Sequence, residues 1–232
     1  MYISSDERTG LFTFQAEGST DPHNPYFIGK LSHPSPASGV TIGAGYDMGG
    51  RNAIQVEYEL VSAGLSSFVA AKLAKGAGLT GHPAAKFVAD NMDIRIEDIQ
   101  ILRNLFAMDF PRYVTRASNY FAYHAATFHS HMSSYGKMYS KAVQFTWDTL
   151  YPSIRVIAID FAYQGFGRMA GGYGKPMHFC MANDFDWLIG YIQHTPGLSR
   201  YEAGRHRASY LQTNKALEMR NYSNSIPETR VV

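Results

Sequence analysis

Cysteine is nearly absent from this 232-residue chain. Cys180 is the single cysteine, so no disulfide can form within the chain. A domain of this length can bury a core large enough to fold without such cross-links. The composition, with 45% hydrophobic and 17% charged residues, is typical of a globular protein and excludes a disordered chain.

Long hydrophobic runs and clusters of basic residues are also missing. No stretch of about 18 apolar residues occurs, so we expect no membrane insertion. The formal net charge is only +2, and Lys and Arg form no aromatic-basic stripe, so we expect no nucleic-acid partner. The first ten residues lack the basic-then-apolar pattern of a signal peptide, which predicts synthesis in the cytoplasm without a secretory leader.

The sequence also lacks histidines spaced as in known metal-binding motifs. His124, His129 and His131 have no acidic residue among them and fit neither a His-Glu-x-x-His motif nor a Cys/His finger. We therefore expect these histidines to lie in a polar loop, and we expect neither a metal ion nor another cofactor.

Proline and glycine, in contrast, are concentrated in residues 21–50. Two short strand-like runs, 25–29 and 38–43, lie within this segment. They predict a β-hairpin with a long, proline-rich connection.

Most of the remaining chain has helical periodicity. Residues 152–162 place apolar side chains on one helical face after Pro152 in a first-turn position. A second periodic run, 99–106, is followed by Pro111, which should kink or end that helix. The stretches 184–193 and 200–223 predict further helices, and 118–141, which has no clear period, should be irregular.

These patterns predict an α+β protein with segregated parts. We expect a single domain, 1–232, with a small N-terminal hairpin lobe (about 1–65) and a larger, mainly helical lobe (about 66–232) around a cleft that could hold a polymer strand. We expect the protein to be a monomer.

Glu17 is the first candidate for acid–base chemistry. It follows an apolar-rich run, 11–14, and precedes Gly18, where the first helix should end. Cleavage of a glycosidic bond needs a carboxyl group that protonates the leaving oxygen and a second group that positions water or supports the oxocarbenium-like transition state. A partly desolvated Glu17 would suit the first task.

The second group of candidates lies in residues 39–50. On a strand, Thr41, Gly43 and Gly45 would share one face, and the two glycines would leave open backbone that a ligand can approach. Asp47 would follow at the strand end. Taken singly, a glutamate at a helix end is usually a solvated group and Gly-x-Gly is usually turn chemistry, so the combination carries the prediction.

The combination resembles the phage-lysozyme superfamily, in particular its pesticin-like branch. The resemblance lies in Glu-Gly at 17–18 and in Ser-Gly-Val-Thr-Ile-Gly-Ala-Gly-Tyr-Asp-Met-Gly-Gly at 38–50. Ile-Asp-Phe-Ala-Tyr-Gln-Gly at 159–165 is similar to a helix beneath the cleft, and Gly-Arg-His-Arg-Ala-Ser-Tyr-Leu at 204–211 is a weaker match to an arginine-rich final helix.

The resemblance implies a lysozyme-like fold and a role for each matching residue. Glu17 would be the general acid, Thr41 would hold the attacking water, and Asp47 would orient that water or stabilise positive charge on the sugar. Asp21 is expected to be a loop residue. The reaction would invert the anomeric carbon, which requires carboxyl groups roughly 6.5–9.5 Å apart.

Substrate-binding candidates complete the site. Tyr26 and Tyr46 could stack on sugar rings, and Gly43 and Gly45 could line the strand beside Thr41. Gln164 stands where many relatives have asparagine, so it keeps an amide at that position.

The predicted activity is therefore hydrolysis of the β-1,4 bond between N-acetylmuramic acid and N-acetylglucosamine in bacterial peptidoglycan. A lytic transglycosylase, a chitinase-like glycosidase and a non-catalytic peptidoglycan-binding module on the same fold are the alternatives, since fold does not guarantee activity.

The substrate predicts where the protein acts. It would work in the periplasm or cell wall of a target bacterium, delivered as a phage endolysin, a bacteriocin or a toxin of a secretion system. An immunity protein would be the cognate partner in the toxin case.

Overall fold

The computed structural model describes residues 5–132, 145–166 and 175–225. Within these residues the chain is mostly helical, and its sheet is a single pair of short antiparallel strands. This content agrees with the predicted α+β class. None of the helices in the described ranges combines the length and the apolar character needed to cross a membrane.

The chain divides into two compact units. We call Gly10–Pro111 the hairpin unit, and Met1–Thr9 with Arg112–Val232 the helical unit. The division that we expected near residue 65 falls within the hairpin unit, between two helices that pack on each other. The boundary of the units lies instead inside one long helix, α6 (Ile99–Met132).

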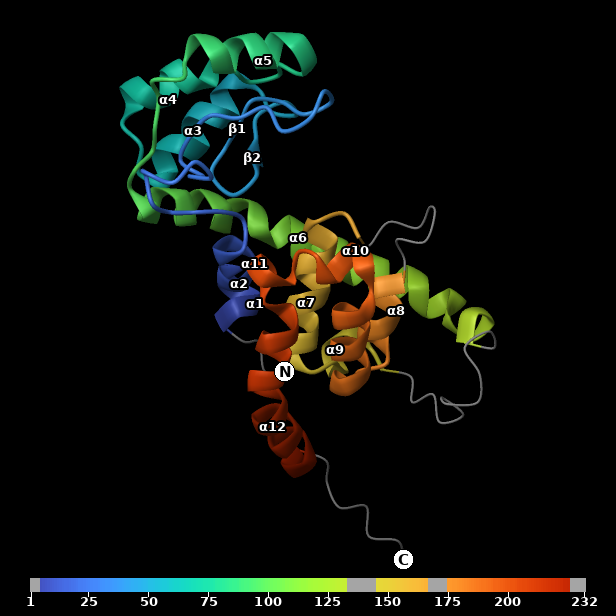
Figure 1. The fold of residues 1–232 in the computed structure, drawn as a ribbon. Helices are drawn as coiled ribbons and strands as arrows, with labels where there is room; N and C mark the ends of the chain where they lie inside the picture. The colour runs from blue at the N-terminus through green and yellow to red at the C-terminus, as the bar shows by residue number, and fades with distance from the viewer. Residues whose placement is uncertain (1–4, 133–144, 167–174, 226–232) are drawn as a thin grey trace, which may run out of the picture. The chain divides into compact units, whose positions relative to one another are not determined.

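The hairpin unit contains one very short hairpin and several helices (Figure 1). Its elements are α2 (Leu11–Gln15), β1 (Thr41–Ile42), β2 (Tyr46–Asp47), α3 (Ala53–Ala63), α4 (Ser67–Ala74), α5 (Gly81–Asp90) and the first part of α6.

The hairpin differs from the predicted one in which segments pair and in its extent. β1 pairs with β2, and the chain reverses at Gly43 (φ 64°) and Gly45 (φ 81°), which adopt left-handed conformations that favour glycine. Residues 25–29, expected to form a strand, contribute only an isolated bridge between Ser19 and Phe27. Prolines in the preceding segment supply no backbone N–H for a longer ladder.

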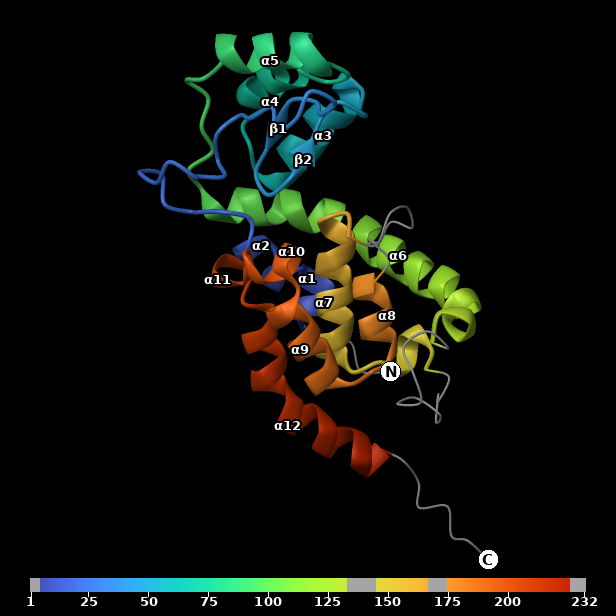
Figure 2. The ribbon, with the colours of Figure 1, turned by 45° about the vertical axis from the view of Figure 1, so that its right-hand side comes forward.

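Local sequence explains the helices next to the hairpin. Asn52 caps α3, because its side chain accepts a hydrogen bond from the Gln55 N–H (2.9 Å), and Ser66 caps α4 in the same way. Gly64, in a left-handed conformation, ends α3. The buried faces of α3 and α4 pack together beside the hairpin (Figures 1 and 2).

The helical unit is assembled around α7 (Pro152–Tyr163). Its other elements are α1 (Ser5–Thr9), the rest of α6, η2 (Trp147–Thr149), α8 (Lys175–Met181), α9 (Phe185–His194), α10 (Pro196–Ser199), α11 (Glu202–Arg205) and α12 (Arg207–Ser225). Contacts join α7 to α1, α8 and α12 (Figure 2).

The predicted helix after Pro152 is confirmed, but it is buried on all sides rather than on one face. Every residue from 153 to 162 is buried, as expected for a helix at the centre of a bundle. Two of these residues are charged, and both have ion-pair partners. Asp160 accepts hydrogen bonds from Arg205 (2.8 Å) and Arg207 (2.7 Å), and Arg155 pairs with Glu7 of α1 (3.0 Å).

The other helix predictions had mixed outcomes. The helix at 184–193 is confirmed as α9, which Asp184 caps. The expectation that residues 200–223 form one helix was wrong, because His206 adopts a left-handed conformation (φ 55°) between α11 and α12.

Helix α6 is longer than its sequence suggests. Pro111 does not end it, and residues 118–132 are helical rather than irregular; residues 133–141 lie outside the described part of the chain. Ala117, Phe121 and His124 are buried at helical spacing, so a histidine at a core position obscured the apolar period. Burial of Phe110 and Tyr113 offsets the hydrogen bond that Pro111 cannot donate.

The Arg155–Glu7 pair provides a test of the helical unit. The two side chains are 2% and 5% exposed, so Arg155→Met should leave the Glu7 carboxylate buried without its guanidinium. We expect a loss of about 3–5 kcal/mol in the free energy of unfolding. Urea titration followed by tryptophan fluorescence measures it, because both tryptophans, Trp147 and Trp187, lie in this unit.

The double variant Glu7→Met/Arg155→Met is the control for this prediction. It removes both charges together and should recover most of the lost stability. Equal destabilisation of the single and double variants would mean that packing, and not the unpaired charge, causes the loss.

Candidate functional site

Two of the predicted catalytic residues lie directly opposite each other in the hairpin. The register pairs Thr41 of β1 with Asp47 of β2. Residues paired in this way in an antiparallel ladder have side chains on the same face, with Cβ atoms roughly 4.5–5.5 Å apart. The six-residue spacing in the sequence therefore becomes a direct neighbour relationship, because the turn at Gly43 and Gly45 is so short.

Both side chains also interact with the peptide groups of Gly39. The Gly39 N–H donates to the Asp47 carboxylate (3.1 Å to Oδ1, 3.2 Å to Oδ2), and the Thr41 hydroxyl donates to the Gly39 carbonyl oxygen (3.3 Å). The Gly49 N–H donates a third bond, 2.7 Å long, to Asp47 Oδ1. Two backbone amides thus fix the Asp47 carboxylate beside the Thr41 hydroxyl.

Glycine is required at position 39 by the close approach of this carboxylate. A Cβ atom built on Gly39 would lie 2.3 Å from Asp47 Oδ1 and 2.3 Å from the Gly49 nitrogen. Any larger residue would displace the carboxylate. The important glycines of the segment are therefore those that surround Asp47.

Gly43 and Gly45, which we expected on the strand face beside Thr41, lie in the turn instead. The Gly43 N–H donates to the Ile28 carbonyl oxygen (2.9 Å), and a Cβ atom on Gly43 would meet Leu102 of α6 at 3.6 Å. Gly43 is thus used for turning and packing, which does not support the expected approach of a ligand to its backbone.

Glu17 follows α2 at a short distance. That helix ends at Gln15, two residues earlier than expected, and the Glu17 N–H donates to the Phe14 carbonyl oxygen (3.2 Å). The Glu17 side chain is half-buried. Backbone hydrogen bonds connect the residues after Glu17 to the hairpin. The Ser19 N–H donates to the Tyr26 carbonyl oxygen, and the Ile28 N–H donates to the Ser19 carbonyl oxygen (both 3.0 Å). The Ile28 carbonyl oxygen in turn accepts from the Gly43 N–H.

Residues 19–26 form a loop held by local polar contacts. Asp21 accepts a hydrogen bond from the His23 N–H (2.9 Å), and Asn24 accepts one from the Tyr26 N–H (2.8 Å). Asp21 is exposed and acts as the loop residue that we expected. The Tyr26 side chain is 80% exposed, so a ring on a fixed backbone is available for a ligand.

Tyr46 is buried against a partly buried cluster of charged groups. Its hydroxyl donates to Glu59 Oε2 of α3 (2.5 Å), and the Arg51 guanidinium lies 4.2 Å from its ring centroid. The ring is 2% exposed and offers no face to a sugar in this structure. This arrangement does not support the prediction that Tyr46 binds substrate.

The electrostatics of this cluster favour its charged carboxylate. Burial alone would raise the pKa of Glu59, but hydrogen bonds from Tyr46 and Gln55 and the charge of Arg51 together lower it below its usual value. Burial, followed by the Glu59 hydrogen bond, raises the pKa of Tyr46, so the phenol stays protonated. The cluster therefore holds a charged Glu59 beside a neutral Tyr46.

Arg51 is the residue that the sequence reasoning missed. It donates to the Asp47 peptide oxygen, to Glu59 (3.1 Å) and to Asp109 of α6. A sequence signal existed, because Asp47 and Arg51 are the only Asp, Glu, Lys or Arg residues between Lys30 and Glu57. Glu59 and Asp109 carry no comparable signal, because they come from helices distant in sequence.

The chain matches a known protein family. Residues 10–168 match the model of a family described as "Domain of unknown function (DUF8812)". The chain belongs to the DUF8812 family. A search of curated proteins finds no match.

The DUF8812 match covers the entire hairpin unit and continues through α7. It therefore includes Glu17, Thr41 and Asp47, and also Gln164 at the C-terminal end of α7. The Gln164 side-chain oxygen accepts a hydrogen bond from Arg207 of α12. Gln164 lies in the helical unit, and its proposed contact with substrate stays a prediction.

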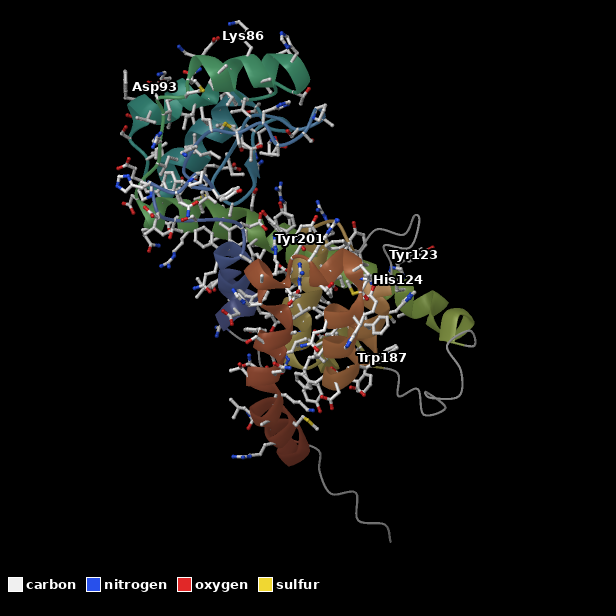
Figure 3. All side chains as sticks on the ribbon, viewed as in Figure 1. Lys86, Asp93, Tyr123, His124, Trp187 and Tyr201 are labelled. Carbon is white, nitrogen blue, oxygen red and sulfur yellow. The ribbon has the colours of Figure 1, made fainter. Side chains whose placement is uncertain are left out.

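The histidines weighed as metal ligands belong to the helical unit of this DUF8812 protein. His124 is buried in α6 rather than in a polar loop, next to Tyr123 (Figure 3), and its ring packs edge-to-face on His178 with centroids 4.6 Å apart. The side chains of His129 and His131 lie outside the described residues. Among the side chains that are described, no cluster of three or more His, Cys, Asp or Glu residues suits a metal ion.

Glu59 makes the hairpin unit sensitive to acid. Its pKa is lowered in the folded state, so its contribution to stability is complete above its unfolded pKa of about 4.5 and is lost as the pH falls through the lower folded value. Glu59→Gln should therefore flatten the decline in stability between about pH 5 and pH 3. Amide hydrogen exchange of α3 across this range measures the effect locally.

Glu57→Gln is the matched control, since Glu57 is exposed on the same helix. It should leave the acid dependence of the wild type unchanged. Parallel pH curves for wild type and Glu59→Gln would contradict the role assigned to Glu59.

Proposed function

We propose that this DUF8812 protein is a muramidase with a lysozyme-like fold, which hydrolyses the β-1,4 bond between N-acetylmuramic acid and N-acetylglucosamine. The observation that carries the proposal is the pairing of Thr41 with Asp47, whose side chains both form hydrogen bonds with the backbone of Gly39. The resemblance to pesticin-like lysozymes assigns catalytic roles to these two residues and to Glu17.

The buried Thr41 (5% exposed) and the half-buried Asp47 would hold one water molecule between their side chains. The Thr41 hydroxyl donates its proton to Gly39, so its oxygen can accept a hydrogen bond from water. The Asp47 carboxylate can accept the second proton of the same water. A water held through both hydrogens keeps a lone pair for attack on the anomeric carbon.

Glu17 supplies the acid in this proposal. Its carboxyl group gives a proton to the glycosidic oxygen as the bond from that oxygen to the anomeric carbon breaks. The water then bonds to the anomeric carbon from the opposite face, and Asp47 takes up its proton. The product is a reducing N-acetylmuramic acid end with inverted configuration.

Substrate contacts are proposed at the surface of the hairpin unit. The exposed ring of Tyr26 is the best candidate for stacking on a sugar, because the loop contacts fix its backbone while the side chain projects. Tyr46 is assigned a structural role instead. Gln164 remains a proposed contact from the helical unit.

The substrate determines where such an enzyme acts. Peptidoglycan lies outside the cytoplasmic membrane, so the proposal includes action in the wall or periplasm of a target bacterium after delivery by a phage or by a toxin-secretion route. A cognate immunity protein is the partner expected in the second case.

Glu17→Gln tests the proposal. The variant keeps the shape of the side chain but cannot donate the carboxyl proton, so the rate of release of reducing ends from purified peptidoglycan should fall about 100- to 10,000-fold. Circular dichroism should show unchanged folding. Reducing-end assays on matched amounts of the two proteins make the comparison.

Asp21→Asn is the matched control. Asp21 is a neighbouring acid whose oxygen accepts the His23 N–H, and asparagine can accept the same bond. This variant should keep wild-type activity. Full activity in Glu17→Gln would show that Glu17 is not the general acid. If the wild type binds glycan strands but releases no product, the protein is a peptidoglycan-binding module and not an enzyme.

A further inference from the structure

Arg51 contacts the backbone of Asp47, whereas Gly39 and Gly49 contact its carboxylate. The chain reaches Arg51 four residues after Asp47, just before the Asn52 cap of α3. One guanidinium nitrogen, Nη1, donates to the Asp47 peptide oxygen, and the Arg51 side chain is only 8% exposed.

The remaining donors of Arg51 connect this contact to two helices. Nε donates to Glu59 Oε2 of α3 (3.1 Å), and Nη2 donates to Asp109 Oδ1 of α6. The guanidinium carbon also lies over the ring of Tyr46, the residue before Asp47, 4.2 Å from the ring centroid. All three nitrogens are thus used, each on a different partner.

Arg51 completes the hydrogen bonding of the peptide group that joins Asp47 to Met48. The strand β2 has two residues, and the N–H of this peptide group, which belongs to Met48, donates to the Val40 carbonyl oxygen (2.8 Å), while its oxygen accepts from Arg51. Backbone amides of Gly39 and Gly49 hold the carboxylate, while Arg51 holds the peptide oxygen. The orientation of Asp47 is consequently fixed relative to α3 and α6 and not only to β1.

We propose that Arg51 is the positioning residue for Asp47: its guanidinium joins the Asp47 peptide oxygen to Glu59 and Asp109 and so aims the Asp47 carboxylate beside Thr41. The catalytic consequence rests on the proposed muramidase function. Lysine cannot replace arginine here, because a single ammonium group does not reproduce the planar fork of donors that reaches three partners.

The test compares Arg51→Lys with Arg95→Lys, the same substitution at an exposed arginine of the hairpin unit. On soluble glycan strands, Arg51→Lys should lower kcat about 100-fold, the cost of a catalytic group displaced by about 1 Å, with KM changed less than about threefold. Arg95→Lys should match the wild type. Asp109→Asn, which keeps an acceptor for Nη2, should lower kcat by a smaller factor.

A second readout does not depend on activity. The amide resonances of Gly39 and Gly49 report the bonds to the Asp47 carboxylate, so they should shift in the ¹H–¹⁵N spectrum of Arg51→Lys and stay in place in Arg95→Lys. Unmoved glycine amides, or a kcat within twofold of wild type, would overturn the proposal. So would a loss of activity that merely follows the unfolded fraction and is recovered on cooling.

The two readouts separate this proposal from the one on which it rests. If the wild type releases no product, the muramidase proposal fails, and the glycine amides alone then decide whether Arg51 positions Asp47. If the wild type is active and the amides do not respond to Arg51→Lys, only the positioning role fails.

Discussion

The Asp47 carboxylate and its two backbone N–H donors are the constraint on which the hairpin depends. A ladder of two residues per strand is too short to be stable alone. The bonds from Gly39 and Gly49 to the carboxylate add to the backbone hydrogen bonds that Thr41 makes with Ser32 and that Met48 makes with Val40. They explain why the segment needs glycine at 39, where a Cβ atom would meet the carboxylate. They also bring Asp47 next to Thr41, so one interaction serves both folding and the proposed chemistry.

Around this hairpin the unit is stabilised by partly buried ion pairs as well as by apolar packing. Arg51 has two carboxylate partners, from α3 and α6, and Tyr46 completes the cluster. Removal of one member of such a network leaves another uncompensated, which is costlier than the loss of a surface ion pair. The helical unit follows the same principle, because α7 carries Asp160 and Arg155 into its core and each is paired there.

Sequence reasoning reached the residues of the hairpin but not its geometry. The motif at 38–50 identified Thr41 and Asp47, yet their register depends on where the chain turns, and the positive φ values of Gly43 and Gly45 were not deducible from alternation alone. Arg51 was missed because its partners, Glu59 and Asp109, are joined to it only by folding. Helix α7 was predictable from its apolar period. The second half of α6 was not, because His124 occupies a core position and interrupts the apolar pattern.

The most direct test of the central claim is digestion of peptidoglycan in H₂¹⁸O, followed by rapid borohydride reduction and mass spectrometry of the released muropeptides. A water held by Thr41 and Asp47 would become the new anomeric oxygen, so the account predicts one ¹⁸O atom in each reduced N-acetylmuramic acid end. Unlabelled 1,6-anhydro ends would contradict it, because the bond would then have been cleaved without water.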